Sequence, residues 1–326
     1  MSTPMTESAD AAGGPAARTT VSIIVPAYNE GIGLAANLKA IDAYLEPFRD
    51  RYDFELILVD DGSTDDTALA AERFAHGRGD AVLLRHDRNL GLGAALRTGF
   101  TRASGDYLIT LDSDLSYGPQ YAIRMLEAME QQGADIVLAS AYMPGGSVAN
   151  VPWIRRMLSR EANRFLSLAT NARLHTLTCM VRAYRASAIR PLAATSNGME
   201  ANPEILFAAL RRGARVVEIP ARLEWTIERA RGASRLNVKR AWSHFLGVLR
   251  CGFSYRPALL LGIPALLPLL PMVAAVLLLL HVSPQVFAAG MLAAIVVQYT
   301  SLAILAGQAT TFLGKNLITH KRHAPR

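Results

Sequence analysis

Residues 54–67 read FELILVDDGSTDDT, and this stretch decides the fold class that the sequence predicts. Its first six residues are an apolar run typical of a buried strand, and the polar residues from Asp60 onward form the turn after it. A strand-like run followed by a polar turn recurs at VSIIV (21–25) and DYLITL (106–111), and further strand-like runs occupy 81–85 and 135–140. Helix-like segments separate these runs at 32–49, 65–76, 92–103 and 119–131. This alternation predicts an α/β domain whose mostly parallel sheet has helices on both faces.

Three of the predicted strands end in side chains that can bind ligands. They are followed by Pro26 to Glu30, by Asp60 to Asp65, and by Asp112-Ser113-Asp114. Because sheets of this kind bind ligands at the carboxyl ends of their strands, we expect these segments to meet at one edge. Two carboxylates two positions apart suit a hard divalent cation, which can neutralise a diphosphate. The alternative for each acidic turn is a helix cap, since Asp and Ser are good N-caps.

The glycine-containing segment Asn89 to Gly99 does not fit a dinucleotide-binding loop. Leu96 stands at the sixth position of the G-x-G-x-x-G pattern, and the segment follows the third predicted strand instead of the first. We therefore expect no dinucleotide site here.

The charge of the chain is unevenly distributed along its 326 residues. From residue 229 onward there are eleven Lys and Arg and no Asp or Glu, whereas the first 228 residues carry 23 basic and 27 acidic residues. The net charge of +7 thus comes from the C-terminal third, which excludes a uniformly basic nucleic-acid binder and indicates contact with a polyanionic surface. The two cysteines, Cys179 and Cys251, exclude a disulfide-rich scaffold and a cysteine-based zinc site.

Two long uncharged segments predict a membrane anchor. Residues 258–280 and about 286–307 each exceed the roughly 20 residues needed to cross a bilayer core, and about five residues join them. A link this short permits only an antiparallel hairpin. Lys and Arg flank the pair on both outer sides and are absent from the link, so the positive-inside rule places both flanks in the cytoplasm. Two buried helices of a soluble core are the alternative.

These segments divide the chain into five parts. Residues 1–20 lack the apolar core of a signal peptide, which predicts a disordered start. The α/β domain is expected to span 21–232, and 233–256 to form helices at the membrane interface, because 236–255 combines apolar and basic residues at helical spacing. A soluble helix with a solvated basic face is the alternative for that segment. The two spans occupy 257–314, and a basic cytoplasmic tail covers 315–326.

Several motifs in a fixed order resemble the family 2 glycosyltransferases of GT-A fold, whose sheet is Rossmann-like. The motifs are VPAYNE (25–30), VDDGSTDDT (59–67), the Asp-x-Asp at 112–114, Tyr142 to Gly146, Thr178 to Arg185 and Arg229 to Leu236. Together they cover roughly 21–240 and are most similar to the branch that makes dolichyl- or polyprenyl-phosphate sugars. The resemblance implies an inverting, metal-dependent transfer of a hexose from a nucleotide sugar to polyprenyl phosphate at the cytoplasmic face of the cell membrane.

The resemblance assigns the donor side of the site to particular residues. Asp112 and Asp114 would hold Mg²⁺ or Mn²⁺ and, with Arg229 and Arg235, act in catalysis. For the two arginines, attraction to the membrane surface is an alternative. The nucleotide sugar would contact Pro26, Tyr28, Glu30, Asp60, Asp61, Asp112, Ser113, Asp114 and Arg182.

The acceptor side is assigned in the same way. Arg155, Ser159 and Ser234 would contact the lipid phosphate, and Arg229 to Leu236 would form a mobile lid. An ordinary interfacial arginine is the alternative for Arg155. Glu204 matches an acidic position of the branch, and a carboxylate at a helix N-terminus explains it equally well.

The chain departs from the family pattern at four places. Ala141 stands where the family commonly has the Arg of a Ser-Arg-Tyr trio, which removes an expected phosphate-binding charge that Arg156 or another residue would have to replace. Ser116 stands where related enzymes often have Gln, so a third metal contact is in doubt. The remaining two departures are Cys179-Met180-Val181-Arg182 for Ser-Gly-Phe-Arg and Ser234-Arg235-Leu236 for Ser-Lys-Leu.

Several functions stay open at this point. GDP-mannose is the favoured donor because of the loop 142–153, and UDP-glucose, UDP-N-acetylhexosamine or an amino-sugar nucleotide are alternatives. A non-catalytic membrane adaptor and a membrane nucleotidyl- or phosphotransferase are alternatives of other classes. The resemblance is also compatible with a homo-oligomer.

Overall fold

The computed structural model describes residues 18–170, 172–192 and 195–225, together with short stretches between 246 and 300. The first half of the described chain alternates strands and helices as predicted. In order, it forms β1 (Thr19–Ala27), α1 (Gly31–Leu45), η1 (Glu46–Phe48), β2 (Tyr52–Asp60), α2 (Thr67–Ala75), β3 (Ala81–Arg85), α3 (Leu92–Arg102), β4 (Tyr107–Thr110), α4 (Gln120–Gln132) and β5 (Ile136–Ser140).

The elements after residue 140 were not predicted individually. They are β6 (Ser147–Ala149), α5 (Trp153–Thr170), β7 (Arg182–Arg185), α6 (Ala186–Ile189), α7 (Ala201–Arg211), β8 (Val216–Pro220) and β9 (Arg222–Glu224). Within the described residues, seven strands form one sheet in the order β3-β2-β1-β4-β7-β5-β8. Only β7 of these runs antiparallel to its neighbours, β4 and β5. The prediction of a mostly parallel α/β sheet is therefore confirmed.

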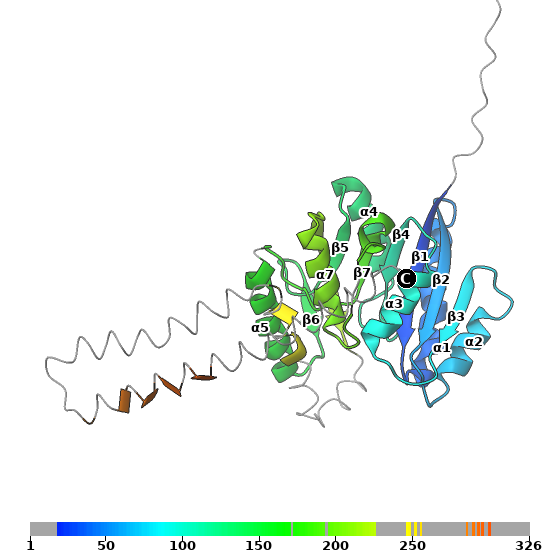
Figure 1. Ribbon diagram of the computed structural model, residues 1–326. Coiled ribbons are helices and arrows are strands. Elements are labelled where there is room, and N and C mark those ends of the chain that lie inside the picture. Colours follow the sequence, from blue (N-terminus) through cyan, green and yellow to red (C-terminus); the bar gives the residue numbers. More distant parts are fainter. Residues whose placement is uncertain are drawn as a thin grey trace, which may run out of the picture.

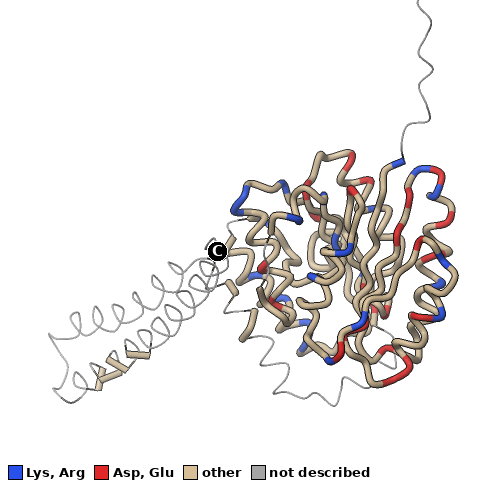
Figure 2. The backbone as a smooth tube through the Cα atoms, turned by 45° about the vertical axis from the view of Figure 1, so that its right-hand side comes forward, with Lys and Arg blue, Asp and Glu red and all other residues tan. Residues whose placement is uncertain are grey.

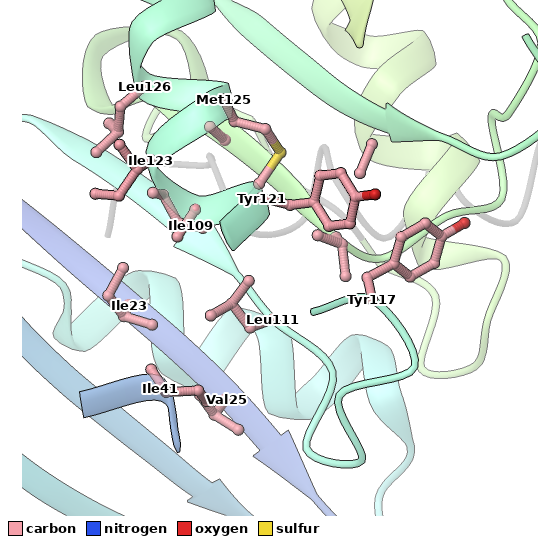
Figure 3. Packing of buried hydrophobic residues seen from close by; sticks show 14 of the residues in the cluster. Ile23, Val25, Ile41, Ile109, Leu111, Tyr117, Tyr121, Ile123, Met125 and Leu126 are labelled. Atoms are coloured by element: carbon pink, nitrogen blue, oxygen red, sulfur yellow. The ribbon is translucent and has the colours of Figure 1, made fainter. Parts of the chain in front are cut away.

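Helices cover both faces of this sheet, as Figure 1 shows. Residues of α1, α2 and α4 pack with β1 and β4 in one core, which contains Leu38, Ile41 and Leu126. Residues of α3, α5, α6 and α7 pack on the opposite face in a second core. Figure 3 shows how the first core continues from Ile23 and Ile109 to Leu111 and the tyrosines Tyr117 and Tyr121. The segment that carries the two aspartates 112 and 114 is thus anchored on both sides by buried side chains.

Most charged residues lie on loops and helices around the sheet (Figure 2). One group of them lies at the amino end of β3, where Arg78 contacts Asp42 at 2.7 Å and Asp80 at 2.9 Å. Arg49 contacts the same Asp80 at 2.8 Å. The hydrogen bonds from Arg78 lower the pKa of Asp42 and of Asp80, despite partial burial. The pKa of each carboxyl is lower in the folded state than in the unfolded state, where it is about 3.9. The two carboxylates therefore stabilise the fold at pH values above about 3.9, and this stabilisation is lost as the pH falls through the folded-state pKa.

We therefore expect Arg78→Gln to lower stability by about 1 kcal/mol at pH 7 and to reduce the loss of stability below about pH 4. Thermal unfolding followed by intrinsic fluorescence between pH 7 and pH 2.5 measures both effects. Arg102→Gln is the matched control, since the nearest carboxylate oxygen of Glu55 lies 3.8 Å from Arg102. A parallel pH dependence in wild type and Arg78→Gln would contradict the assignment.

The glycine-containing segment 89–99 packs closely against the loop before α7. The Gly93 N–H donates to the Asn197 carbonyl at 2.7 Å, and a Cβ on Gly93 would collide with the Ser196 carbonyl and the Ala201 side chain. Glu204 holds the same loop, because its carboxylate accepts hydrogen bonds from the Ser196 N–H at 2.9 Å and from Thr195. Burial raises the pKa of Glu204, but these hydrogen bonds outweigh it and the pKa is lowered. Close packing of a loop explains why small residues begin α3.

The last described residues near the domain pack against its second core. Val248 is buried, the rings of Tyr255 and Phe207 lie 4.3 Å apart, and Gly252 lies against Phe165 and Leu166 of α5. Among the residues that the structure describes, no helix is long and apolar enough to cross a bilayer. The predicted spans at 258–280 and 286–307 lie almost entirely outside those residues, as do most of 1–20 and 233–256 and all of the tail 315–326.

Candidate active site

Asp112 and Asp114 leave the sheet at the end of β4 and are held in place by their own turn. Leu115 has a φ of 50°, an uncommon value for a bulky side chain, and this turns the chain back toward the aspartates. The Ser116 hydroxyl contacts Asp114 Oδ1 at 2.7 Å and Asp112 Oδ2 at 3.2 Å. The Ser116 N–H also donates to Asp114 Oδ1 at 3.0 Å. The turn therefore brings both carboxylates to one hydroxyl, so they face the same small volume.

A pocket of about 440 Å³ opens beside these carboxylates. Its other wall is formed by β9 and by the residues that follow β6 and β9. The Glu224 N–H donates to the Ser116 carbonyl at 2.8 Å, and the Trp225 N–H donates to the Ala149 carbonyl at 3.2 Å. Asn150, in the same wall, has a φ of 59°. The pocket is lined by Asp114, Leu115, Ser116, Gly118, Gln120, Asn150, Arg222, Glu224 and Trp225.

The ends of β1 and β2 lie side by side at the same edge of the sheet. Ala27 pairs with Asp60 in the register of these strands, and Pro26 is buried within β1. Beyond the strands, the Asn29 N–H donates to the Ser63 hydroxyl at 3.0 Å, and the Asn29 side chain accepts from the Thr64 N–H at 3.0 Å. The three polar strand ends therefore converge as the sequence predicts.

The side chains of this edge differ in what they contact. Tyr28 is exposed, Glu30 is half-buried, and Ser113 is buried with its carbonyl accepting from Asn37 at 2.9 Å. Asp65 behaves as a cap, since its carboxylate accepts from the first N–H of α1, on Gly31, and from Thr67 at the start of α2. Tyr28 and Glu30 are thus accessible to a ligand, whereas Asp65 supports the two helices.

Asp60 and Asp61 are buried, and each faces a basic residue at the end of β3 or directly after it. Arg85 Nε lies 3.1 Å from Asp60 Oδ2, which receives no aligned hydrogen bond in the described part, while Asp60 Oδ1 accepts from the Ser63 N–H. His86 Nδ1 lies 2.7 Å from Asp61 Oδ1, and its Nε2 lies 2.9 Å from the Thr98 hydroxyl. His86 is not among the residues that the sequence motifs predicted for the site. The pairing of β2 with β3, which sets Asp60 beside Arg85, was the signal that could have identified it.

Asp61 also fixes the loop before α3. Its two carboxylate oxygens accept from the N–H groups of Leu90, at 2.9 Å, and Gly91, at 2.7 Å. All the close contacts of this carboxylate are therefore made within the protein. Its predicted contact with the nucleotide sugar stays a prediction, and the geometry favours an indirect effect through the loop.

Arg182 is completely buried at the start of β7. Its guanidinium donates to three backbone carbonyls, those of Cys179 at 2.7 Å, Asn202 at 2.8 Å and Leu177 at 2.5 Å. The neighbouring Cys179 is buried too, and burial raises the pKa of its thiol to about 12. The thiol is therefore protonated at neutral pH and unsuited to act as a nucleophile. Arg182 fastens the segment 177–179 to the start of α7, and its predicted contact with the nucleotide sugar stays a prediction.

The predicted acceptor residues Arg155 and Ser159 lie one turn apart on α5. The Arg155 guanidinium lies over the ring of Trp225, 5.3 Å from its centre, and Trp225 lines the same pocket as Asp114. Arg155 Nε is buried without a hydrogen-bond partner among the described residues. Ser159 hydrogen-bonds to Tyr142, whose pKa is raised by burial. The structure thus brings Arg155 to the edge of the aspartate pocket.

Ala141, where the resemblance predicts an arginine, is buried next to Tyr142. A second pocket, of about 690 Å³, lies there and is lined by both residues together with Arg156 and His175. Arg156 is therefore placed beside the position that lacks the expected charge. The other predicted residues, Arg229, Ser234 and Arg235, lie outside the described residues.

The two aspartates suit a magnesium or manganese ion. Among the described residues, no group of three or more His, Cys, Asp and Glu side chains could hold a metal ion. Mg²⁺ is commonly held by only one or two carboxylates, with the substrate's phosphates and water completing its shell. A pair of oxygen ligands beside an open pocket therefore fits an ion that arrives with a diphosphate.

The comparison with protein families agrees with this geometry. Residues 22–192, more than half of the chain, match the family described as Glycosyl transferase family 2. The chain belongs to this family. It is therefore a glycosyltransferase, and the matched residues of this glycosyltransferase run from β1 to α6 and include Asp112, Asp114, Arg155 and Ser159.

Two curated relatives of this glycosyltransferase are named for polyprenol monophosphomannose and for undecaprenyl phosphate. A polyprenol monophosphomannose synthase from Mycolicibacterium smegmatis is 33% identical over 230 residues, which are 68% of this chain and 82% of the relative. An undecaprenyl-phosphate 4-deoxy-4-formamido-L-arabinose transferase from Edwardsiella ictaluri is 33% identical over 234 residues, which are 71% of this chain and 67% of the relative.

A solved structure of another glycosyltransferase shares the fold. The glucosyl-3-phosphoglycerate synthase from Mycobacterium tuberculosis, in complex with Mn²⁺, UDP and its product, superposes with a TM-score of 0.55 at 19% identity. The match covers 73% of this chain and 80% of the synthase. It supports a GT-A-like fold for this glycosyltransferase.

Proposed function

We propose that this glycosyltransferase moves a hexose from a nucleotide sugar, with GDP-mannose favoured, to the phosphate of a polyprenyl lipid such as dolichyl or undecaprenyl phosphate. The observation that carries the proposal is the meeting of two sets of residues at one pocket. Asp114 and Ser116 line it from the end of β4, and Arg155 of α5 lies over the ring of Trp225, which lines it too. Carboxylates suit the metal-bound diphosphate of the donor, and an arginine suits the phosphate of the acceptor.

The donor lies along the edge formed by β1, β2 and β4. Tyr28 and Glu30, which are accessible, contact the nucleotide, and Pro26, Asp60, Asp61 and Ser113 shape its cavity from buried positions. Asp112 and Asp114 would hold Mg²⁺ or Mn²⁺, which would supply positive charge to the leaving diphosphate. Arg182 acts on the donor by holding the segment 177–179 in place.

The reaction is a single displacement. An oxygen of the lipid phosphate forms a bond to the anomeric carbon as the bond from that carbon to the diphosphate oxygen breaks, and the bonding electrons leave with the nucleoside diphosphate. The acceptor is already an anion at neutral pH, so the step needs no general base. Attack opposite to the leaving group inverts the anomeric centre. Arg155, Ser159 and Ser234 position the acceptor, and Arg229 and Arg235 close over the site.

The place of the reaction is the cytoplasmic face of the cell membrane. The two uncharged segments within 257–314 anchor the chain as a hairpin, and 233–256 lies at the membrane interface. This arrangement leaves the catalytic domain and both ends of the chain in the cytoplasm, where nucleotide sugars are made. A lipid substrate at the membrane is supported by the names of the two curated relatives, which specify polyprenol monophosphomannose and undecaprenyl phosphate.

The donor sugar is tested by a panel of labelled nucleotide sugars. The purified full chain in detergent receives Mg²⁺ or Mn²⁺, polyprenyl phosphate and one donor at a time. We expect label from GDP-mannose in the lipid fraction, and none after chelation of the metal. Label from an amino-sugar nucleotide instead would support the second candidate, which the relative named for 4-deoxy-4-formamido-L-arabinose favours. Label from UDP-glucose or UDP-N-acetylhexosamine alone would overturn the choice of mannose as the donor sugar. It would still support transfer of a hexose to polyprenyl phosphate.

Arg156 is proposed to supply the charge missing at Ala141. Hydrogen bonds to charged groups contribute about 1.5–3 kcal/mol, so Arg156→Gln should raise the KM for polyprenyl phosphate by about 10- to 100-fold. The KM for the nucleotide sugar should change little. Arg73→Gln, an exposed arginine on α2, is the control and should leave both constants unchanged. An unchanged KM for the lipid in Arg156→Gln would refute this role.

A further inference from the structure

The outward side of α5 is unusual for a helix that faces water. Positions 153, 157, 160, 164 and 168 follow one another at intervals of three and four, so they share one side of the helix. Three of them are large apolar residues, and the exposed fractions of Trp153, Met157 and Leu168 are 67%, 47% and 72%. The other two are Arg160 and Arg164. The opposite side carries the buried residues Ala162, Asn163, Leu166 and Ala169.

The charge of this side is positive. Arg160, Arg164 and Arg173 line one groove of about 610 Å³ together with Leu168. Within the described part of the chain, Arg164 forms an ion pair with Glu161 at 2.6 Å, and no carboxylate lies within ion-pair distance of Arg160 or Arg173. Exposed Trp, Met and Leu interleaved with arginines are typical of helices that lie in the headgroup region of a bilayer.

The course of the chain brings α5 close to the predicted membrane entry. Gly252 lies against Phe165 and Leu166 of α5, and Tyr255 stacks on Phe207 of the neighbouring α7. The uncharged segment predicted to span the bilayer begins three residues after Tyr255, and three residues of chain reach at most about 11 Å. The helix α5, at the side of the domain remote from β3 in Figure 1, is therefore among the elements nearest to that entry.

We propose that the outward side of α5 docks onto an anionic bilayer surface. Trp153, Met157 and Leu168 enter the headgroup region, and Arg160, Arg164 and Arg173 contact lipid phosphates. The opposite side of the same helix carries Arg155, which lies over the ring of Trp225 beside the aspartate pocket, and Ser159, which hydrogen-bonds to Tyr142. Docking would thus hold the acceptor side of the pocket one helix diameter, about 10 Å, from the lipid phosphates. This surface is additional to the hairpin and to the interfacial segment 233–256.

The test places a fluorescent label on α5 of the full chain in vesicles. Leu168→Cys, in a Cys251→Ser background in which Cys179 stays buried, carries an environment-sensitive label. The control is Leu69→Cys on α2, which is 43% exposed and packs at the β2–β3 side. The vesicles contain phosphatidylcholine with or without phosphatidylglycerol, plus a lipid whose chain carries a spin-label quencher.

With phosphatidylglycerol present, we expect at least about twofold stronger quenching at position 168 than at position 69, together with a blue shift of emission. Arg160→Gln/Arg164→Gln/Arg173→Gln should reduce the quenching at 168 to the value found without phosphatidylglycerol. Equal quenching at the two positions would overturn the proposal, as would energy transfer between labels at 168 on separate copies, which would indicate a protein interface. The readout is independent of sugar transfer, so it fails or succeeds separately from the proposed function.

Discussion

Asp114→Asn should lower the rate of sugar transfer by about 1,000-fold or more, because it removes one of two carboxylate charges beside the leaving diphosphate. The substitution is nearly isosteric. The amide oxygen can still accept the hydrogen bonds that Asp114 Oδ1 receives from the Ser116 N–H and hydroxyl, at 3.0 and 2.7 Å. The turn should therefore keep its shape, and the melting temperature should stay close to that of the wild type.

The matched control is Asp87→Asn. Asp87 is exposed and follows β3, so it lies at the carboxyl edge of the same sheet but is separated from β4 by two strands, β2 and β1. Initial rates should be measured at several Mn²⁺ concentrations for both variants. We expect Asp87→Asn to match the wild type and the defect of Asp114→Asn to persist at high Mn²⁺. Near-normal transfer by Asp114→Asn would show that the pair of carboxylates is not the metal site.

Arg182→Met should have the largest effect on stability. It removes a buried cation whose guanidinium satisfies three backbone carbonyls, those of Leu177, Cys179 and Asn202. An unsatisfied buried polar group costs about 1–3 kcal/mol, so we expect a loss of about 3–5 kcal/mol in the free energy of unfolding. Urea unfolding of the full chain in detergent measures this loss.

Arg185→Met separates this effect from the general cost of removing an arginine. Arg185 ends the same strand, is 37% exposed in its side chain and lies 3.7 Å from Asp135, so its loss should cost at most about 1 kcal/mol. If Arg182→Met were as stable as the wild type and only its KM for the nucleotide sugar rose, Arg182 would be a direct donor contact. The proposal that Arg182 acts by holding the segment 177–179 in place would then be wrong.

The part of the fold in which strands and helices alternate was predictable because the apolar residues of each element follow the pattern typical of a strand or of a helix. The strands VSIIV and FELILV and the helices up to residue 131 were placed within a few residues of their bounds in the structure. The convergence of the three polar strand ends followed from the rule for parallel sheets and is confirmed by the parallel pairing of β1 with both β2 and β4.

The second half of the domain was not predictable in this way. The strand β7 has only four residues, RAYR, and nothing in them indicates that they insert antiparallel between β4 and β5. The contacts of buried charges depend on register and packing, which a single sequence does not specify. The pairing of Asp61 with His86 needed the alignment of β2 with β3, and the three carbonyl acceptors of Arg182 come from two separate segments.

The most direct test of the central claim is the stoichiometry of one reaction mixture. Purified full chain, Mn²⁺, polyprenyl phosphate and the best donor of the panel are incubated, and the lipid and the released nucleotide are both analysed by mass spectrometry. The account predicts one hexosyl residue joined to the lipid by a phosphodiester, and one nucleoside diphosphate released for each. Release of nucleoside monophosphate with a pyrophosphate-linked lipid, or nucleoside diphosphate with free sugar and unchanged lipid, would contradict it.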